Sequence, residues 1–147
     1  MKNKLLVADF NKETGESIVI ISNKHGEFTG FAHMHPEDAP YISNLVGCRY
    51  AEARAHIACI QHQKNILNHK IKALQDFEKT IMYMKDYNKD SLEARQLRKR
   101  IYNLKRERTK LVNKITSAKQ ALKESMDKRD AYLKNVNKPK TKMGKIE

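Results

Sequence analysis

The chain contains little of what β-rich or secreted proteins are built from. Its 147 residues include no Trp, only 5 Gly and 3 Pro, and only 2 Cys. Sandwiches and barrels need many turn residues, so this scarcity excludes an ordinary all-β domain and favours long helices. With only two thiols, Cys48 and Cys59, a disulfide framework is not expected and both side chains should be reduced.

Long hydrophobic runs are also missing. The longest cover about four residues, against roughly 20 needed to span a bilayer. The run 5–8 follows a basic start but ends at Asp9, before it reaches the length of a signal peptide. The sequence therefore predicts no membrane span and a cytoplasmic location.

The basic residues are distributed unevenly. The chain carries 30 Lys and Arg against 17 Asp and Glu, a formal net charge of +13. Residues 1–40 hold 4 basic and 6 acidic side chains, residues 41–88 hold 7 and 4, and residues 89–147 hold 19 and 7. Nearly all of the excess positive charge is therefore C-terminal, whereas the first forty residues are mildly acidic.

Residues 1–36 have the pattern of a three-stranded antiparallel β-meander. The expected strands are residues 5–10, 17–21 and 27–34, and they are separated by turn-forming residues around Gly15 and Gly26. Three strands have at most one good apolar face, so another element must cover it.

Residues 37–134 have the pattern of a helical hairpin that packs with the sheet as one domain. Asp38 is the expected N-cap, Pro40 lies near the first turn, and Gly47 is expected to kink or interrupt the helix. From Cys48 the apolar residues follow helical spacing over about forty residues. This seam consists of Tyr50, Ala53, Ile57, Ile60, Leu67, Ile71, Leu74, Ile81 and Met84, with Lys64 and Glu78 in two of its positions.

A second helix is expected after the turn-forming residues 86–89. Asp90 and Glu93 form a capping-box pattern, which predicts Asp90 as the N-cap. The seam of this helix consists of Leu97, Ile101, Leu104, Leu111, Ile115, Ala118 and Leu122, extended by Met126 and Leu133, with Arg108 in one position. Residues 135–147 are rich in Lys and contain Pro139 and Gly144, so they are predicted to be a disordered basic tail.

The expected fold class is therefore α+β, with a small sheet followed by a two-helix hairpin. Such a hairpin has one seam and no third layer, and the sheet covers only one end of it. The area buried is small for a monomer of this length, so we expect a homo-oligomer, a dimer or larger, formed through the helices.

Histidine and cysteine are the candidate metal ligands. His56, Cys59 and His62 follow each other at intervals of three, and His33 alternates with His35. This spacing is compatible with zinc, but a structural site needs four ligands and no CxxC or HExxH motif is present. We therefore expect no metal and no cofactor, with Cys59 as a small buried residue.

Signals for catalysis are weaker still. There is no GxSxG motif, no Gly-rich phosphate loop and no pair of carboxylates in apolar surroundings. Cys48 before Arg49 is only a hint of thiolate stabilisation. The sequence predicts a binding protein and not an enzyme.

A dense basic run is the strongest signal outside the core. It consists of Arg95, Arg98, Lys99, Arg100, Lys105, Arg106, Arg108 and Lys110. Because helix residues turn by about 100°, Arg95, Arg98, Tyr102 and Lys105 or Arg106 share one side, where phosphates and a base could sit. The alternative is an ordinary solvated face of a coiled coil.

Aromatic and polar residues also gather near the hairpin turn. They are Phe77, Tyr83, Tyr87, Asn88 and Asp90, and a second group of Arg49, Tyr50 and Arg54 lies at the start of the first helix. Nucleotide recognition uses a ring for stacking, an amide for the base edge and cations for phosphate. The alternative is that Phe77 is part of the core and the others form the turn.

Four segments of the first third resemble small phage proteins of the anti-Thoeris sponge family. These segments are residues 7–10 with Thr14 and Gly15, residues 26–30, residues 35–38 and residues 47–54, and the helical hairpin agrees in layout over most of the remainder. The resemblance implies an oligomer that sequesters a cyclic ADP-ribose isomer made by a bacterial defence enzyme, in the cytoplasm of the host cell, without degrading it. Some members resemble dual sponges that also hold cyclic trinucleotides at a separate site.

The resemblance also implies a set of ligand-binding residues between subunits. The matching positions are Arg54, Phe77, Asn88, Arg95 and Arg106, with Lys105 as an alternative to Arg106 and Arg49 as an alternative to Arg54. For the second ligand site they are Lys24, His25 and Gly26.

Two other functions fit the same composition. A basic coiled-coil protein that binds DNA or RNA, or inhibits a nucleic-acid-dependent host system, would lose affinity for long polyanions steeply with salt. A purely structural hairpin would serve assembly or scaffolding. A pocket for a small nucleotide differs from both in its chemical selectivity.

Overall fold

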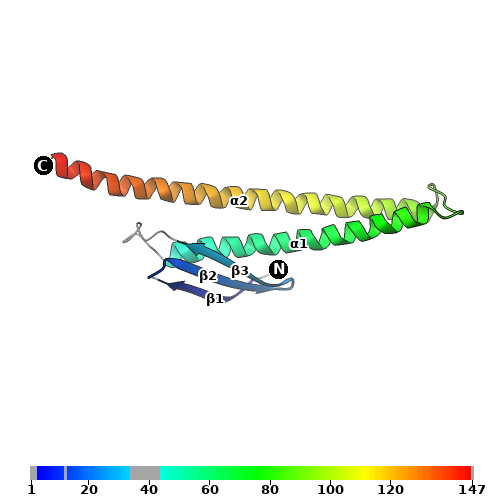
Figure 1. Ribbon diagram of the computed structural model, residues 1–147, viewed down its shortest axis with the longest axis horizontal. Helices are drawn as coiled ribbons and strands as arrows, with labels where there is room; N and C mark the ends of the chain where they lie inside the picture. Colours follow the sequence, from blue (N-terminus) through cyan, green and yellow to red (C-terminus); the bar gives the residue numbers. More distant parts are fainter. Residues whose placement is uncertain (1–2, 12, 34–43, 147) are drawn as a thin grey trace. The chain divides into compact units, whose positions relative to one another are not determined.

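The protein is described from a computed structural model, which describes residues 3–11, 13–33 and 44–146, with only the backbone for residues 44, 45, 133 and 135–146. The elements in chain order are β1 (Lys4–Asn11), β2 (Glu16–Asn23), β3 (Gly26–His33), α1 (Asn44–Met82) and α2 (Leu92–Ile146) (Figure 1). The α+β class predicted from the sequence is confirmed: a three-stranded antiparallel sheet precedes two long helices.

The sheet has the strand order β1-β2-β3, and both neighbouring pairs are antiparallel. Its two turns contain glycines with positive φ, Gly15 at 76° and Gly26 at 126°, a conformation that favours glycine. The register of β1 on β2 shifts between Leu5 and Val7, which leaves Leu6 as the extra residue of a β-bulge.

The chain divides into two compact units, each described by itself. Unit 1 consists of Met1–Cys59 and Thr116–Glu147, and unit 2 consists of Ile60–Ile115. Unit 1 therefore contains the sheet, the first part of α1 and the last part of α2. Unit 2 contains the rest of both helices and their connection.

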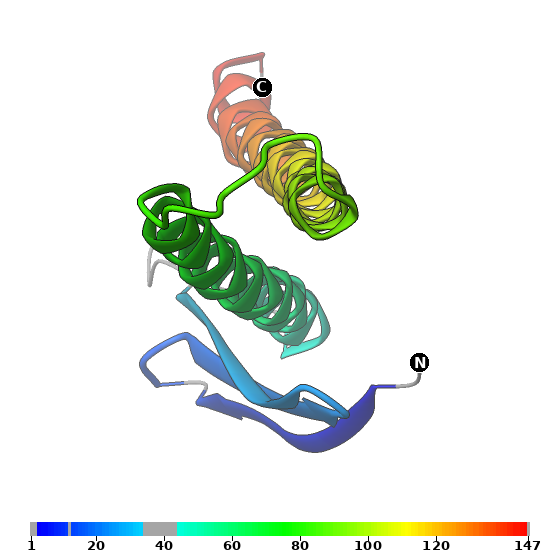
Figure 2. The same cartoon turned by 90° about the vertical axis from the view of Figure 1, so that its right-hand side faces the viewer.

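Helix α1 covers one face of the sheet in unit 1 (Figure 2). Val19, Ile21 and Ala32 of the strands are buried together with Ala51 and Ala55 of α1. The sheet and α1 lie very close together at Gly30. A Cβ atom added to Gly30 would collide with the backbone of Ala51 and Ala55. Small residues on both surfaces permit this approach.

Gly47 belongs to the same contact. The sequence predicts a kink or interruption there, and the interruption is wrong, since α1 runs through Gly47 as continuous helix. The physical reason for the glycine is space: a Cβ atom on Gly47 would collide with Oγ of Ser17 on β2. Its missing side chain serves packing against the sheet and not a break in the helix.

Unit 2 is a helical hairpin with a narrow core. Its buried apolar residues are Ile71, Ala94, Ile101 and Ile115. Three of the four are predicted seam positions, while Ala94 was not among them. Arg108, which replaces an apolar residue in the seam, is half-buried and donates from Nη1 to Oδ1 of Asn68 at 3.1 Å.

The N-cap of α2 is Ser91, so the prediction of Asp90 is wrong by one residue. The Ser91 Oγ accepts a hydrogen bond from the backbone N–H of Ala94 at 3.2 Å, three residues into the helix. Asp90 belongs to the preceding turn, where its N–H donates to Oδ1 of Asn88 at 2.9 Å.

The structure describes the C-terminal end of the predicted hairpin but not its predicted start. The backbone of α2 is helical to Ile146, through most of the segment 135–147 for which the sequence predicts a disordered tail. Extending an existing helix costs less than nucleating one, and Lys is a good helix former, which favours this continuation. The predicted cap Asp38 and first-turn Pro40 lie outside the described residues.

No helix within the described ranges is both long enough and apolar enough to cross a membrane.

Candidate functional site

The candidate ligand-binding residues are divided between the two units. Phe77, Asn88, Arg95 and Arg106 belong to unit 2, whereas Arg54 belongs to unit 1. The candidates for the second site, Lys24, His25 and Gly26, form the turn between β2 and β3 in unit 1. The capacity of each unit to bind a ligand therefore depends on its own residues.

The hairpin turn of unit 2 contains a small open hollow of about 200 Å³. Its lining consists of Ile81, Met84, Asp86, Tyr87, Asn88, Ser91, Glu93 and Ala94. Asn88 is therefore a lining residue, while Phe77 and Arg106 are not. The side-chain oxygen of Asn88 accepts a hydrogen bond from the N–H of Asp90 and so holds the turn, and the Asn88 side chain is exposed; the NH₂ group of the amide is not used by this bond.

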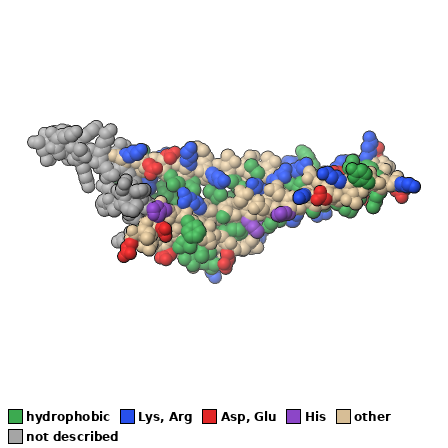
Figure 3. All heavy atoms as spheres, viewed as in Figure 1, with side chains coloured by type: hydrophobic (Ala, Val, Ile, Leu, Met, Phe, Trp, Pro, Cys, Tyr) green, Lys and Arg blue, Asp and Glu red, His purple; other side chains and the backbone are tan. Residues whose placement is uncertain are grey.

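Aromatic rings and cations are exposed on unit 2. Phe77 is 55% exposed and Tyr102 is 61% exposed, and the alternative of Phe77 as a core residue is wrong within this chain. The guanidinium carbon of Arg106 lies 5.9 Å from the centre of the Tyr102 ring, a cation–π distance. Arg95 is exposed on the same helix. Figure 3 shows Lys and Arg side chains along the helices, with hydrophobic side chains exposed between them.

Two members of the basic run have structural partners. Arg98 donates from Nη2 to the carbonyl oxygen of Lys89 at 2.6 Å and so closes the connection between the helices. Arg108 is engaged with Asn68 in the seam. These two arginines are held by hydrogen bonds, whereas Arg95, Arg100 and Arg106 are exposed and have no side-chain hydrogen bond among the described contacts.

Arg54 connects three parts of unit 1. Its Nη1 donates to the carbonyl oxygen of Phe31 on β3 at 2.6 Å, and its Nη2 lies 3.8 Å from Sδ of Met126 on α2. The guanidinium also lines a hollow of about 330 Å³ with Glu16, Ser17, Phe31, Ala32 and His33. Arg54 therefore has a structural role in this chain, and its remaining donors border an open space.

The turn between β2 and β3 is organised by Asn23. The Asn23 Oδ1 atom accepts a hydrogen bond from the backbone N–H of His25 at 2.8 Å, and Gly26 completes the turn with positive φ. Lys24 is exposed and His25 is half-buried. The turn thus presents one exposed cation on a rigid backbone.

A larger groove lies within unit 1, between the first part of α1 and the last part of α2. Its volume is about 590 Å³, and its lining consists of Val46, Arg49, Tyr50, Ala53, His56, Ile57, Ala118, Ala121, Leu122 and Ser125. The phenol of Tyr50 donates to the carbonyl oxygen of Ser125 at 3.3 Å. Burial of the phenol has the largest effect on the pKa of Tyr50 and raises it. The charge of Arg129 lowers this pKa, and the charge of Asp130 raises it. Arg49, the alternative to Arg54, is exposed at this groove.

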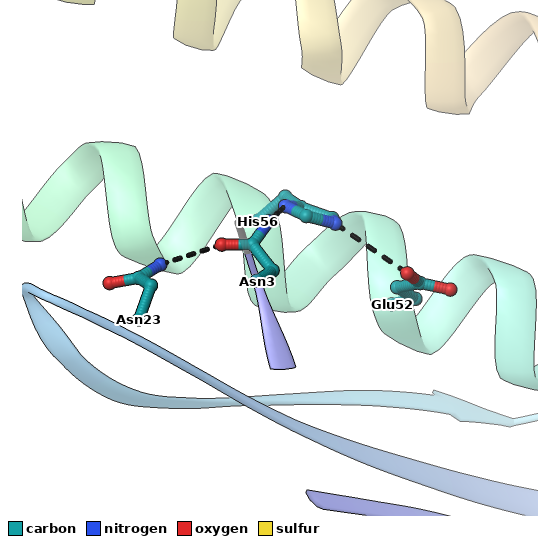
Figure 4. Close-up of polar contacts among 4 residues, drawn as sticks. All are labelled: Asn3, Asn23, Glu52 and His56. Atoms are coloured by element: carbon teal, nitrogen blue, oxygen red, sulfur yellow. Dashed lines mark hydrogen bonds and ion pairs between the residues drawn. The ribbon is translucent and has the colours of Figure 1, made fainter. Parts of the chain in front are cut away.

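Two of the candidate metal ligands, His56 and Cys59, have other polar contacts, and those of His56 are drawn in Figure 4. His56 Nδ1 lies 3.0 Å from Nδ2 of Asn3, and its Nε2 lies 3.6 Å from Oε1 of Glu52. Asn23 donates from Nδ2 both to Oδ1 of Asn3 at 2.8 Å and to Sγ of buried Cys59 at 3.3 Å. Among the residues that the structure describes, no group of three His, Cys, Asp or Glu is placed to hold a metal ion; His35 lies outside them.

The Asn3–Asn23–His56 network is not predicted by the sequence. Asn3 and Asn23 are separated by twenty residues, and only the pairing of β1 with β2 brings them together. The N–H of His25 fixes the orientation of the Asn23 amide, and this orders each donor in turn as far as Nδ1 of His56. No local spacing signals such a contact.

Comparison of the chain with models of protein families, with curated proteins and with solved structures gives no match.

Proposed function

We propose that this protein binds and sequesters a cyclic ADP-ribose isomer without cleaving it, as a phage anti-defence protein in the cytoplasm of the host cell. The observation that carries the proposal is the exposed pair of Tyr102 and Arg106, in a unit where Phe77 is also exposed. Aromatic rings and cations of this kind suit a ligand that has both a purine base and phosphates.

The chemistry of such a ligand matches these side chains. An adenine ring stacks on an aromatic face, and phosphate oxygens accept charge-assisted hydrogen bonds from arginine. Unit 2 carries fifteen basic and six acidic residues, so its field attracts anions. The exposed amide of Asn88 adds a donor for a base edge. None of these groups has to act as a nucleophile or base, in keeping with sequestration.

We propose further that the site is completed by a second copy of the chain in a homo-oligomer. Ile66 and Phe77 of α1 are 38% and 55% exposed, and with Ala73 they follow helical spacing along one side of the helix. A two-helix unit has no third layer to cover this side. Packing of two hairpins would bury it, as in a four-helix bundle, and would bring arginines of both copies around one ligand.

The β2–β3 turn is the proposed second site, for a cyclic oligonucleotide. Lys24 supplies an exposed cation there, and Gly26 lets the backbone approach a phosphate without interference from a side chain. His25 adds a ring beside them.

Depletion and recovery of ligand test the proposal directly. The purified protein is incubated with cyclic ADP-ribose isomers and, separately, with cyclic oligonucleotides; it is then removed by filtration and heated. We expect one isomer to be depleted from the filtrate and released intact on heating. An altered product would show an enzyme instead, and no depletion of any cyclic ADP-ribose isomer would refute the proposal.

Matched variants locate the site. Phe77→Ala and Arg106→Ala should lose most depletion of the isomer, while Lys110→Ala, an exposed cation of the same helix, should keep it. Lys24→Ala should affect only cyclic oligonucleotides. Full depletion by both Phe77→Ala and Arg106→Ala would exclude these residues. Affinity for long DNA or RNA that falls steeply with salt, without selectivity for any cyclic ligand, would favour the nucleic-acid alternative.

A further inference from the structure

The β1 edge of the sheet is open. Within the part of the chain that the structure describes, β1 pairs only with β2, so its other edge presents backbone N–H and C=O groups without strand partners. The side chains of Lys4–Asp9 are all exposed, and Leu5, Leu6 and Val7 are exposed by 55%, 42% and 39%. An apolar edge strand of this kind is a template for another strand.

The opposite edge of the sheet is occupied in part. On β3, the carbonyl oxygen of Phe31 already accepts a hydrogen bond from Arg54. On β1, a side chain engages the backbone only beyond the apolar segment, where Oδ1 of Asp9 accepts from the N–H of Phe10 at 2.9 Å. Residues 4–8 of the open edge have no such cap among the described contacts. The two edges thus differ in the backbone groups that side chains already engage, and the apolar segment of β1 has the more open edge.

We propose that β1 pairs antiparallel with β1 of a second copy of this chain, which joins two three-stranded sheets into one. The edge consists, in chain order, of a cation, four apolar residues and an anion. When two such strands run antiparallel about a two-fold axis between Leu6 and Val7, Lys4 of each copy lies opposite Asp9 of the other. Leu5 then lies opposite Ala8, and Leu6 opposite Val7. Each cross-strand pair is either oppositely charged or apolar, the combinations that stabilise a sheet.

The charges also select the direction of pairing. A parallel arrangement in register would place Lys4 beside Lys4 and Asp9 beside Asp9, and like charges in directly opposite positions are destabilising. The antiparallel arrangement is also isologous, since the same surface is used by both copies, as a closed two-fold dimer requires. The occupant that fits this edge is therefore the chain itself.

The bulge at Leu6 lies at the centre of this register. A bulge on an edge strand discourages pairing because it leaves one residue unpaired and bends the strand, most of all where it interrupts a regular segment. Here the two irregularities meet at the two-fold axis, and the regular segments on either side, residues 4–5 of one copy and 8–9 of the other, remain free to pair. The register thus accommodates the bulge.

Cysteine cross-linking between two variants tests the register. Leu5→Cys and Ala8→Cys are prepared separately, mixed so that subunits exchange, and oxidised mildly. A disulfide-linked dimer should form in the mixture and not in either variant alone, because position 5 faces position 8 of the other copy and not itself. The wild-type chain under the same oxidant gives the background from Cys48 and Cys59. A mixture that cross-links no more than its components overturns the proposal.

A charge exchange gives a second, independent readout. Lys4→Asp places like charges opposite each other at both ends of the pairing and should increase the hydrogen-exchange rate of amides 5–8 several-fold. The double variant Lys4→Asp with Asp9→Lys restores opposite charges and should restore slow exchange. Circular dichroism confirms that each variant is folded. If the single change leaves exchange unaltered, or the double change fails to restore it, β1 does not pair in this way.

These measurements report on β1 alone. Association through the helices, as in the proposed function, would bring copies together but would not link position 5 to position 8 or respond to the charge exchange. A positive result therefore establishes the strand pairing whether or not the hairpins also associate.

Discussion

Unit 1 and unit 2 bury their apolar residues by different means. In unit 1 a helix lies against a sheet through small residues, such as Ala51 and Ala55 beside Gly30, so the two backbones are nearly in contact. In unit 2 two helices share a seam of large aliphatic residues, of which Ile71, Ile101 and Ile115 are buried. The core of unit 1 therefore depends on the close approach of two backbones, whereas the core of unit 2 depends on the volume of its buried side chains.

The surfaces of the two units differ as well. Unit 2 carries fifteen basic and six acidic residues, whereas unit 1 carries fifteen and eleven. Unit 2 also exposes Phe77, Tyr83 and Tyr102. The unit with the narrower core thus has the larger excess of positive charge, and its three exposed rings compare with Phe31 and Tyr132 in unit 1. In the proposed function, unit 1 provides stability and unit 2 the larger part of the binding surface, and substitutions in each unit test this difference.

The largest effect is expected at Gly30 in unit 1. Gly30→Leu places a side chain onto the backbone of Ala51 and Ala55, which cannot move aside without separating α1 from the sheet. We expect a loss of about 4 kcal/mol or more in the free energy of unfolding. Urea unfolding followed by circular dichroism measures it. Thr29→Ala, an exposed neighbour on the same strand, should change stability by less than about 1 kcal/mol. Equal unfolding midpoints for both variants would contradict the close approach.

Adjacent positions of α2 give the next test, in unit 2. Ile101→Ala removes buried volume from the seam and should cost about 3 kcal/mol. Tyr102→Ala removes an exposed ring and should leave the stability of the chain within about 0.5 kcal/mol. Hydrogen exchange should show lost protection in unit 2 for the first variant, with the sheet still protected. If Tyr102→Ala proves as destabilising as Ile101→Ala, the ring is buried, for example by a second copy.

The sequence predicts the buried residues of unit 2 better than those of unit 1. Large aliphatic residues at intervals of three and four give a clear signal, and Ile71, Ile101 and Ile115 were predicted from it. The face of α1 toward the sheet carries Gly47, Ala51, Ala55 and Cys59 at intervals of four, and small residues give almost no hydrophobic periodicity. The interval of four between these small residues is the signal for the face toward the sheet, whereas Gly47 taken alone predicts a kink or interruption.

The candidate site shows a similar limit. Residue types near the hairpin turn indicated Asn88, which does line a hollow there. The partners of Arg54 could not be predicted, because the carbonyl oxygen of Phe31 and the sulfur of Met126 come from distant parts of the chain. Residue type gives the chemistry that is available, whereas only the fold decides which cations are already occupied.

Ser17 tests the close packing of unit 1 with an effect of opposite sign. Its Oγ is buried and has no hydrogen-bond partner among the described atoms. Ser17→Ala removes a polar group that was desolvated without compensation, so we expect a gain of about 1 kcal/mol. Ser22→Ala, on the same strand and half-buried, should change stability by less than about 0.5 kcal/mol. Destabilisation by Ser17→Ala in thermal unfolding would mean that the hydroxyl group forms a bond in solution.

The N-cap provides a test of comparable size in unit 2. Ser91→Ala should cost about 1 kcal/mol, because the N–H of Ala94 loses its acceptor. Asp90→Ala should cost less, since only the backbone N–H of Asp90 takes part in the turn. Urea unfolding of the two variants decides which residue caps α2. A larger loss for Asp90→Ala would support the capping box that the sequence suggests.

The smallest effect is expected at Tyr50, in the groove of unit 1, and it appears only in alkali. Burial raises the pKa of Tyr50 above its ordinary value of 10.0, so the folded state holds the phenol proton more tightly than the unfolded state does. The resulting stabilisation is complete below pH 10 and is lost as the pH rises through the higher folded-state pKa. Tyr50→Phe cannot titrate, so the stability difference between wild type and variant should shrink above pH 10. A difference that stays constant across that range would mean that the ring is fully solvated and that the groove is open to water at this position.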